Sequence, residues 1–346
     1  MAQAAGTAGE KRVMKQDMST KNVTIHGEAV EKWPALPFEA WKETVETLHM
    51  WTQVAGKVRL ALSPYVNHWW QVPLYVTARG LTTSPVPYQA GIFEVNFDFI
   101  EHNLFILTSD GTTKAIPLIS RSVAEFYREL MASLKALGIE VEINTRPVEV
   151  PNPIRFEEDT VHASYDPVSV NRFWHVLIQT DKVMKQHRSH FLGKSSPIHF
   201  FWGSFDLALT FFSGRRAPER PDADSITREA YSHEVISFGF WPGDASFPRP
   251  AFYAYTAPVL PGLETASIRP ASAFYSSDRG EFFLLYDTVR LADAPEQMLL
   301  DYYWTTYEAG ARLGRWDREV LERKRENWDG SKVGVGEWRN NIVFRP

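Results

Sequence analysis

The sequence predicts an α+β fold built as a tandem duplication of one unit: a helix, an antiparallel sheet and a second helix. In both halves, helical patterns flank a group of strand patterns. Successive strand patterns are separated by short turns rather than by helices, which is typical of antiparallel sheets. The helical pattern that closes the first half, Ser122–Gly138, aligns with Met298–Gly314 at the end of the second half. We therefore expect helices to be segregated to one face of each sheet.

The first half opens and closes with a helix. Pro37 suits a first helical position, and apolar residues recur after it at three- and four-residue spacing up to Leu48. This helix is expected to end before Gly56. A second helix covers Ser122–Leu137, and Gly138 is placed to close it. The strands expected between these helices are Val58–Leu62, Trp69–Thr77, Ile92–Ile100 and Leu104–Thr108.

The second half has the same order of elements. Asp166 is a helix cap followed by Pro167 at the first helical position, and the apolar face continues to about His190. Met298–Leu313 is the closing helix. The tract Ser213–Arg228 contains prolines and has no apolar period, so it is expected to be an exposed loop. The expected strands are Ile198–Trp202, Phe205–Phe212, His233–Trp241, Ala251–Thr256, Ala271–Tyr275 and Glu281–Tyr286.

The duplication defines the expected domains. Residues 33–150 form the first repeat and 151–325 the second, which carries long loop insertions, while residues 1–32 and 326–346 form loosely packed tails. The string His68-Trp69-Trp70 matches His199-Phe200-Phe201, so the two histidines are expected on equivalent strands. Two related halves create a natural cleft between equivalent surfaces, where a ligand would bind. Chance similarity of two amphipathic helices is the alternative to duplication.

Composition excludes several classes of protein. The net charge of −5 argues against a nucleic-acid-binding protein, because neutralising phosphates requires clustered Lys and Arg. Cysteine is absent, which removes disulfides, thiolate metal sites and cysteine nucleophiles and is consistent with a reducing compartment. The longest apolar stretch, His199–Gly214, is interrupted by Asp206 and is shorter than the ~20 residues that span a bilayer. We expect a soluble, cytoplasmic protein with no membrane partner.

Common nucleotide and hydrolase motifs fail on inspection. Gly193-Lys194-Ser195 resembles the end of a phosphate-binding loop, but the glycine required upstream is Arg188. His233-Glu234 begins like a zinc-protease helix, yet position 237 is Ser and the segment alternates like a strand. No glycine fingerprint for dinucleotides is present.

Histidines in apolar, aromatic surroundings are the strongest remaining candidates. Imidazole is a common metal ligand and the usual acid–base group near neutral pH, so a divalent transition metal is the cofactor to consider. The alternative is that each is a core histidine bonded to the backbone. The expected metal ligands are His49, His68, His199 and His233.

Carboxylates and aromatic residues complete the predicted site. Asp206 lies in an apolar strand, and a buried charge there should be paired or functional. Glu234 points to the opposite face from His233 on a regular strand, so these two should not share one metal. The predicted catalytic residues are His199, His68, Asp206 and Glu234. The predicted ligand-binding residues are Trp70, Trp202, Asn67 and Tyr165.

These residues suggest an enzyme that acts on a small molecule in an aromatic cleft. The competing hypotheses are a non-catalytic module that binds a small ligand in an aromatic pocket, and a scaffold in which the histidines are structural. Several long strings, among them Val161–Pro167 and Pro197–Asp206, resemble an uncharacterised bacterial protein family described only as a domain of unknown function. The resemblance covers about Trp33–Arg323. It implies a soluble bacterial protein of this length and supplies no activity, cofactor or catalytic residue.

Overall fold

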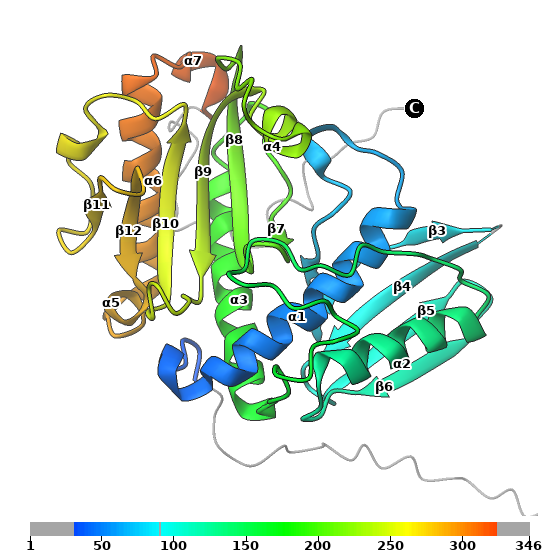
Figure 1. The fold of residues 1–346 in the computed structure, drawn as a ribbon. Helices are drawn as coiled ribbons and strands as arrows, with labels where there is room; N and C mark the ends of the chain where they lie inside the picture. The colour runs from blue at the N-terminus through cyan, green and yellow to red at the C-terminus, as the bar shows by residue number, and fades with distance from the viewer. Residues whose placement is uncertain (1–30, 90, 324–346) are drawn as a thin grey trace, which may run out of the picture. The chain divides into compact units, whose positions relative to one another are not determined.

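Two antiparallel sheets with α-helices against them form the fold, which confirms the predicted α+β class (Figure 1). The computed structural model describes residues 31–89 and 91–323. The predicted tails, residues 1–32 and 326–346, lie outside the described residues, apart from Glu31 and Lys32. None of the described helices is long and apolar enough to cross a membrane.

Sheet 1 belongs to the first half. Its order is β1 (Tyr75–Val76), β2 (Gly80–Thr82), β4 (Gly91–Asp98), β5 (Asn103–Thr108) and β6 (Thr113–Pro117), and β3 (Val86–Tyr88) also pairs with β4. Helices α1 (Phe38–Leu62) and α2 (Val123–Ala136) pack with it. Phe126 of α2 stacks between Trp51 of α1 and Phe97 of β4, so that aromatic rings join the three elements.

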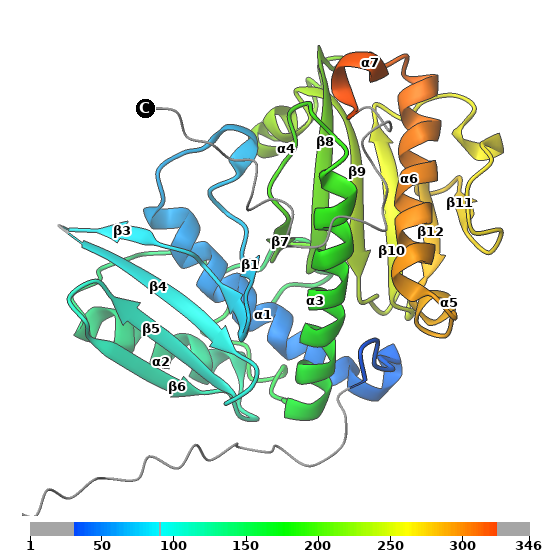
Figure 2. The same ribbon diagram turned by 180° about the vertical axis from the view of Figure 1, so that it is seen from behind.

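Sheet 2 belongs to the second half and carries the site described below. Its order is β11 (Phe274–Ser276), β12 (Glu281–Leu285), β10 (Ala251–Ala257), β9 (His233–Trp241), β8 (Asp206–Arg216) and β7 (His199–Phe201). Helices α3 (Pro167–Arg188) and α6 (Pro295–Leu313) cover one face, as Figure 2 shows. The His187 ring of α3 packs on Phe211 of β8 and Phe238 of β9. Residues of the other parity, such as Asp206 and Ala208, therefore face away from these helices.

The predicted starts of the helices are confirmed at α2 and α3, where capping groups determine the first turn. Ser122 and Glu125 form a capping box at the start of α2. Asp166 accepts hydrogen bonds from the backbone N–H groups of Val168 and Ser169, and Pro167 is the first residue of α3. Several elements of the structure were not predicted from the sequence: β2, β3, β6, α4 (Ser225–Ala230), α5 (Tyr286–Arg290), α7 (Arg318–Leu321), η1 (Asn67–Trp69) and η2 (Leu263–Thr265).

Three predictions of local structure were wrong. Helix α1 continues through the expected strand Val58–Leu62. Gly56 lies within this helix, where it leaves space for the Trp202 side chain, and does not end the helix. A Cβ on Gly56 would lie 2.3 Å from the indole of Trp202. Most of Trp69–Thr77 is not a strand, since His68 and Trp69 adopt φ of 59° and 60° in η1. The tract Ser213–Arg228 is a loop only in its middle, between the end of β8 at Arg216 and Asp224, which caps α4.

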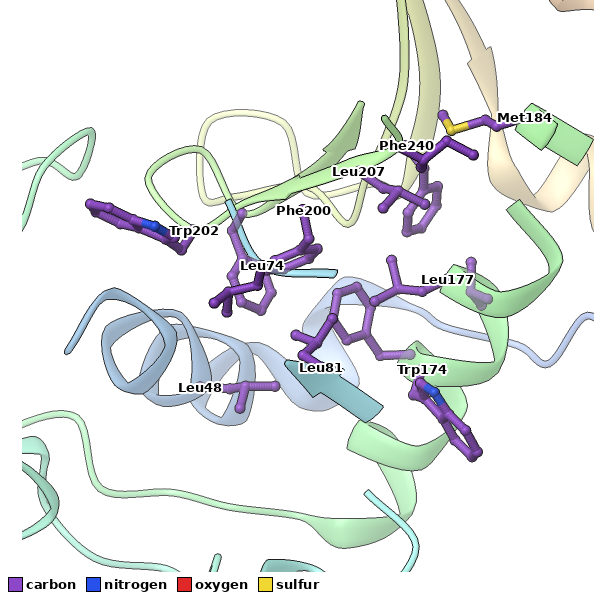
Figure 3. Close-up of a cluster of buried hydrophobic side chains, with 14 of the residues drawn as sticks. Leu48, Leu74, Leu81, Trp174, Leu177, Met184, Phe200, Trp202, Leu207 and Phe240 are labelled. Atoms are coloured by element: carbon purple, nitrogen blue, oxygen red, sulfur yellow. The ribbon is translucent and has the colours of Figure 1, made fainter. Parts of the chain in front are cut away.

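The two halves share contacts and a core. Leu74 and Phe200 pair through two backbone hydrogen bonds of 2.9 Å, which places the β1 end of sheet 1 beside β7 of sheet 2. One hydrophobic cluster extends through both halves, and Figure 3 shows part of it, from Leu48 to Met184. The division at residue 150 stays a prediction, as does the duplication. Its expectation of equivalent strands for His68 and His199 was wrong, because His68 lies in η1 and His199 in β7.

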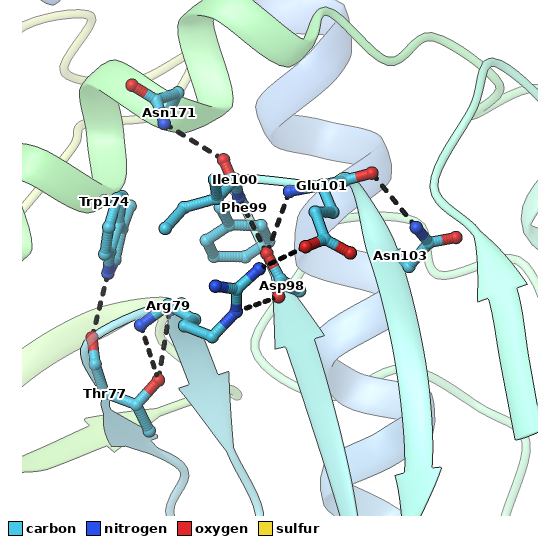
Figure 4. A network of polar contacts seen from close by, with 10 residues as sticks. Thr77, Arg79, Asp98, Phe99, Ile100, Glu101, Asn103, Asn171 and Trp174 are labelled. Atoms are coloured by element: carbon cyan, nitrogen blue, oxygen red, sulfur yellow. Dashed lines mark hydrogen bonds and ion pairs between the residues drawn. The ribbon is translucent and has the colours of Figure 1, made fainter. Parts of the chain in front are cut away.

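Helix α3 is also tied to the edge of sheet 1 by polar contacts (Figure 4). Trp174 Nε1 donates to the Thr77 carbonyl at 3.1 Å, and Asn171 Nδ2 donates to the Phe99 carbonyl at 3.0 Å. Beside them, Arg79 pairs with the buried carboxylate of Asp98. The helix that covers sheet 2 is therefore fixed to both halves.

Candidate active site

A cavity of about 920 Å³ lies against the face of sheet 2 that α3 and α6 leave uncovered. Strands β8, β10 and β12 contribute Asp206, Tyr253, Tyr255, Glu281 and Phe283 to its lining. The other walls come from α1, from the segment Glu149–Ile154 that follows the first half, and from the loop after β9.

Asp206 is the most buried carboxylate in this cavity, with 7% of its surface exposed. The Ser204 hydroxyl donates to its Oδ1 and the Tyr253 phenol donates to its Oδ2. Burial raises the pKa of Asp206, and these two hydrogen bonds act in the opposite direction. The phenol reaches Asp206 by crossing over Gly239 of β9, where a Cβ would lie 2.0 Å from Tyr253 Cζ. The absence of a side chain at position 239 is therefore required for this arrangement.

Glu281 of β12 lies on the same face of sheet 2, one strand beyond Tyr253 of β10. It pairs with Tyr255 in the β10–β12 register, and the Tyr255 phenol is 2.9 Å from the phenol of Tyr231. Burial raises the pKa of Glu281 to about 7, with a contribution from the charge of Asp206 and an opposing one from Arg279. Its carboxylate has no hydrogen bond or ion pair within residues 31–89 and 91–323. Both protonation states of Glu281 are therefore populated near neutral pH.

Glu149 brings a third carboxylate to the cavity from the segment between the halves. Desolvation raises its pKa, and the charge of Asp206 raises it further. Its Oε1 packs against Gly203, where a Cβ would lie only 2.4 Å from it. Asp206 thus raises the pKa of both Glu149 and Glu281, so its charge acts on each of them electrostatically.

Two histidines line the cavity. Burial lowers the pKa of His49 to about 4, so the ring is neutral, and its Nε2 donates to the Gly203 carbonyl at 2.9 Å. His162 Nδ1 is 2.7 Å from Oδ2 of Asp159, which is fully buried and also accepts from the backbone N–H groups of Val161 and His162. A carboxylate at Nδ1 fixes the tautomer of the neutral ring and leaves Nε2 as an acceptor.

The other predicted metal ligands lie outside this cavity. His68 Nε2 is 2.6 Å from Lys194 Nζ, His68 Nδ1 is 3.1 Å from the Glu229 carbonyl, and the His68 ring is 5.7 Å from that of His233. His199 is 1% exposed, and neither ring nitrogen has a hydrogen-bond partner in the described part of the chain. Those residues include no group of three or more His, Cys, Asp or Glu side chains arranged to hold a metal ion.

The remaining predicted site residues have contacts elsewhere. Glu234 pairs with Arg215, and the Tyr165 phenol is 2.9 Å from His102 Nδ1. Trp202 Nε1 donates to the Val72 carbonyl while its ring covers Gly56. Asn67 and Trp70 lie in and directly after η1, where the Trp70 ring is 5.2 Å from that of His68. Of all the predicted site residues, the cavity contains Asp206 and His49.

Most residues of the cavity are not among the predicted site residues. Glu281, Tyr253 and Tyr255 share the parity of Asp206 on their strands, which is a signal that the alternation of the predicted strands contains. Nothing comparable marks Glu149 or His162, since both lie in segments without regular structure.

The chain belongs to a family of unknown function (DUF5996), whose model matches residues 33–323. No curated protein and no solved structure is significantly similar to it.

Proposed function

We propose that this protein is an enzyme that binds a small organic molecule in the cavity on sheet 2 and transfers a proton to or from it. The supporting observation is the Glu281 carboxylate, which lines the cavity without a hydrogen-bond partner in the described residues and has a pKa of about 7. A group whose pKa lies near the working pH is best suited to general acid–base catalysis.

The neighbouring residues suit the supporting roles of such a site. The hydroxyls of Ser204 and Tyr253 hold Asp206 in one orientation, which makes it a fixed acceptor for a substrate donor. The Tyr231 and Tyr255 phenols lie beside Glu281 and can hydrogen-bond a substrate oxygen. His162, oriented by Asp159, offers Nε2 as the second proton acceptor. Proton donor and acceptor thus come from different elements around one cavity.

A non-catalytic binding protein is the second candidate. Trp241, Tyr253 and Phe283 line the same cavity, and aromatic walls of this kind bind ligands whether or not a reaction follows. Metal binding by the predicted histidines stays a separate proposal, and elemental analysis of the untagged protein tests it.

Comparing wild-type protein with Glu281→Gln tests the proposed function. Each protein is incubated with a mixture of small metabolites, and mass spectrometry records which compounds disappear and which form. We expect the wild type to convert at least one compound and the variant to do so about 100-fold more slowly or worse. Asp278→Asn is the matched control, because Asp278 is an exposed carboxylate in the turn before β12 and does not line the cavity. Equal conversion by wild type and Glu281→Gln would contradict the assignment, and binding without conversion would favour the second candidate.

A further inference from the structure

We infer that the molecule bound in this cavity carries a positively charged organic ammonium group. This inference rests on the proposed function in one respect only, namely that the cavity on sheet 2 is a ligand site. It adds the chemical class of the ligand, which follows from the charge of the lining and from the nature of its walls.

The lining contains an excess of carboxylates. Among the described residues, five acidic side chains and one arginine, Arg279, line the cavity. Arg279 is exposed, and its guanidinium lies over the rings of Trp241 and Phe247 at 5.6 and 5.8 Å. It donates to Ser246 Oγ at 3.4 Å and forms no ion pair with a cavity carboxylate in the described part of the chain. The five acidic residues are Glu46, Glu149, Asp206, Asp244 and Glu281.

The five acidic side chains differ in how far hydrogen bonds from neighbouring groups already stabilise their charge. Asp244 is engaged by its own loop, because its Oδ1 accepts from the backbone N–H groups of Ser246 and Phe247. Asp206 receives two hydroxyl hydrogens, which are neutral donors and leave its charge uncompensated. Glu149 and Glu281 accept no hydrogen bond from the described residues. Desolvation and the charge of Asp206 destabilise both as anions, although Arg279 partly offsets this for Glu281 and Glu149 is an exposed residue. A cation between these carboxylates would reverse that destabilisation, whereas an anionic ligand would increase it.

The two histidines do not supply the missing positive charge. His49 is held neutral by burial, with a pKa of about 4. His162 already interacts with the carboxylate of Asp159, which lies outside the lining. The compensating cation must therefore come with the ligand.

The walls favour an organic cation over a metal ion. Tyr253 and Phe283 occupy adjacent strands in direct register, and Trp241 lies on the same face at the end of β9. Aromatic rings attract ammonium groups through their faces and contact the attached alkyl groups. A volume of about 920 Å³ suits a molecule of many atoms, and the described residues offer no group of three ligands to a metal. Carboxylates beside aromatic rings are the recognition chemistry of amines and quaternary ammonium compounds.

A pair of probes that differ in charge but not in shape tests this inference. Choline and 3,3-dimethylbutan-1-ol have the same branched form, and only choline is cationic. Their affinities are measured by isothermal titration calorimetry on the full chain, followed by other ammonium compounds of increasing size, each beside its neutral isostere. We expect the ammonium member to bind about tenfold more tightly or better in at least one pair.

Variants locate the effect in the cavity. Glu281→Gln should reduce the preference for the cation about tenfold, and Asp278→Asn, which removes an exposed carboxylate nearby, should leave it unchanged. Circular dichroism and a thermal melt establish that each variant is folded. The inference is overturned if no ammonium compound binds more tightly than its neutral isostere, or if both variants lower the preference equally.

The outcome separates this inference from the proposed function. If the metabolite experiment identifies an uncharged or anionic substrate, the inference is wrong and the enzyme assignment stands. If ammonium compounds bind with the expected preference but no compound is converted, the inference stands and the enzyme assignment is wrong.

Discussion

Replacing Glu281 by Gln should stabilise the protein near and above neutral pH and leave its stability unchanged below about pH 4. The folded protein raises the pKa of this carboxyl from 4.5 to about 7. Below pH 4.5 the group is protonated in the folded and unfolded chains, so it favours neither. Between about pH 4.5 and 7 the unfolded chain is increasingly ionised while the folded chain keeps its proton, and above this window the group is ionised in both states. The wild type therefore loses stability across this window.

The size of the effect follows from the two pKa values. At ~1.4 kcal/mol per pH unit, the difference between 4.5 and about 7 corresponds to about 3 kcal/mol. Glutamine has nearly the same shape and does not ionise, so the variant avoids this cost. We expect Glu281→Gln to be more stable than the wild type by about 3 kcal/mol from about pH 7 upwards, by ~1 kcal/mol near pH 5, and to match it below about pH 4. Active sites commonly contain groups that reduce stability in this way.

Urea denaturation followed by tryptophan fluorescence measures this difference. Curves for both proteins are recorded at several pH values between about 3.5 and 9, and the difference in unfolding free energy is plotted against pH. Every other titrating group is common to the two proteins, so the slope of this plot reports Glu281 together with its electrostatic coupling to Asp206. A difference that is constant with pH, or a variant that is less stable near pH 9, would show that Glu281 is not destabilised as an anion.

Three further substitutions test other parts of the structure. Gly239→Ala places a Cβ 2.0 Å from Tyr253 Cζ and should displace the phenol, so we expect ligand binding to be lost and the unfolding free energy to fall by ~1–3 kcal/mol; unchanged calorimetry and denaturation curves would refute the contact. His199→Leu removes a ring whose pKa is lowered from 6.5 to about 3 by burial, so the variant should resist unfolding between those pH values better than the wild type; equal acid denaturation profiles would disprove this. Asp159→Asn keeps an acceptor for the backbone but turns a donor towards Nδ1 of His162, which reverses the tautomer, and turnover should fall ~100-fold or more while ligand affinity persists; unchanged turnover would remove His162 from the site.

The parts of the fold that the sequence predicted correctly depend on local chemistry. A cap and a proline mark the start of α3 at Asp166 and Pro167, and these groups act on the first turn of their own helix. The end of α1 could not be predicted in this way. Gly56 resembles a helix stop when considered alone, and only the indole of Trp202, from the second half of the chain, shows why a side chain is excluded there.

The candidate site was predictable in part for the same reason. The alternation of β8 and β10 places Asp206 and Tyr253 on one face or the other, but the sequence does not state which face the helices cover. That choice is made by the packing of α3 and α6, for example through His187 against Phe211. Once the covered face is known, the carboxylates and phenols that line the cavity can be identified as those on the uncovered face.

Histidines and carboxylates in apolar strands also differ as evidence for a site. Burial lowers the pKa values of His187 and His199 to about 3, and both rings are then neutral aromatic groups that fill space in the core. A histidine can be accommodated in this way at moderate cost, so its presence among aromatic residues does not by itself indicate function. A carboxylate has no such neutral, space-filling form unless its pKa is raised far above its usual value. Burial raises the pKa values of both Asp206 and Glu281, so each carboxylate is held in the strand at a cost, and a carboxylate in an apolar strand is therefore stronger evidence for a functional site than a histidine in the same surroundings.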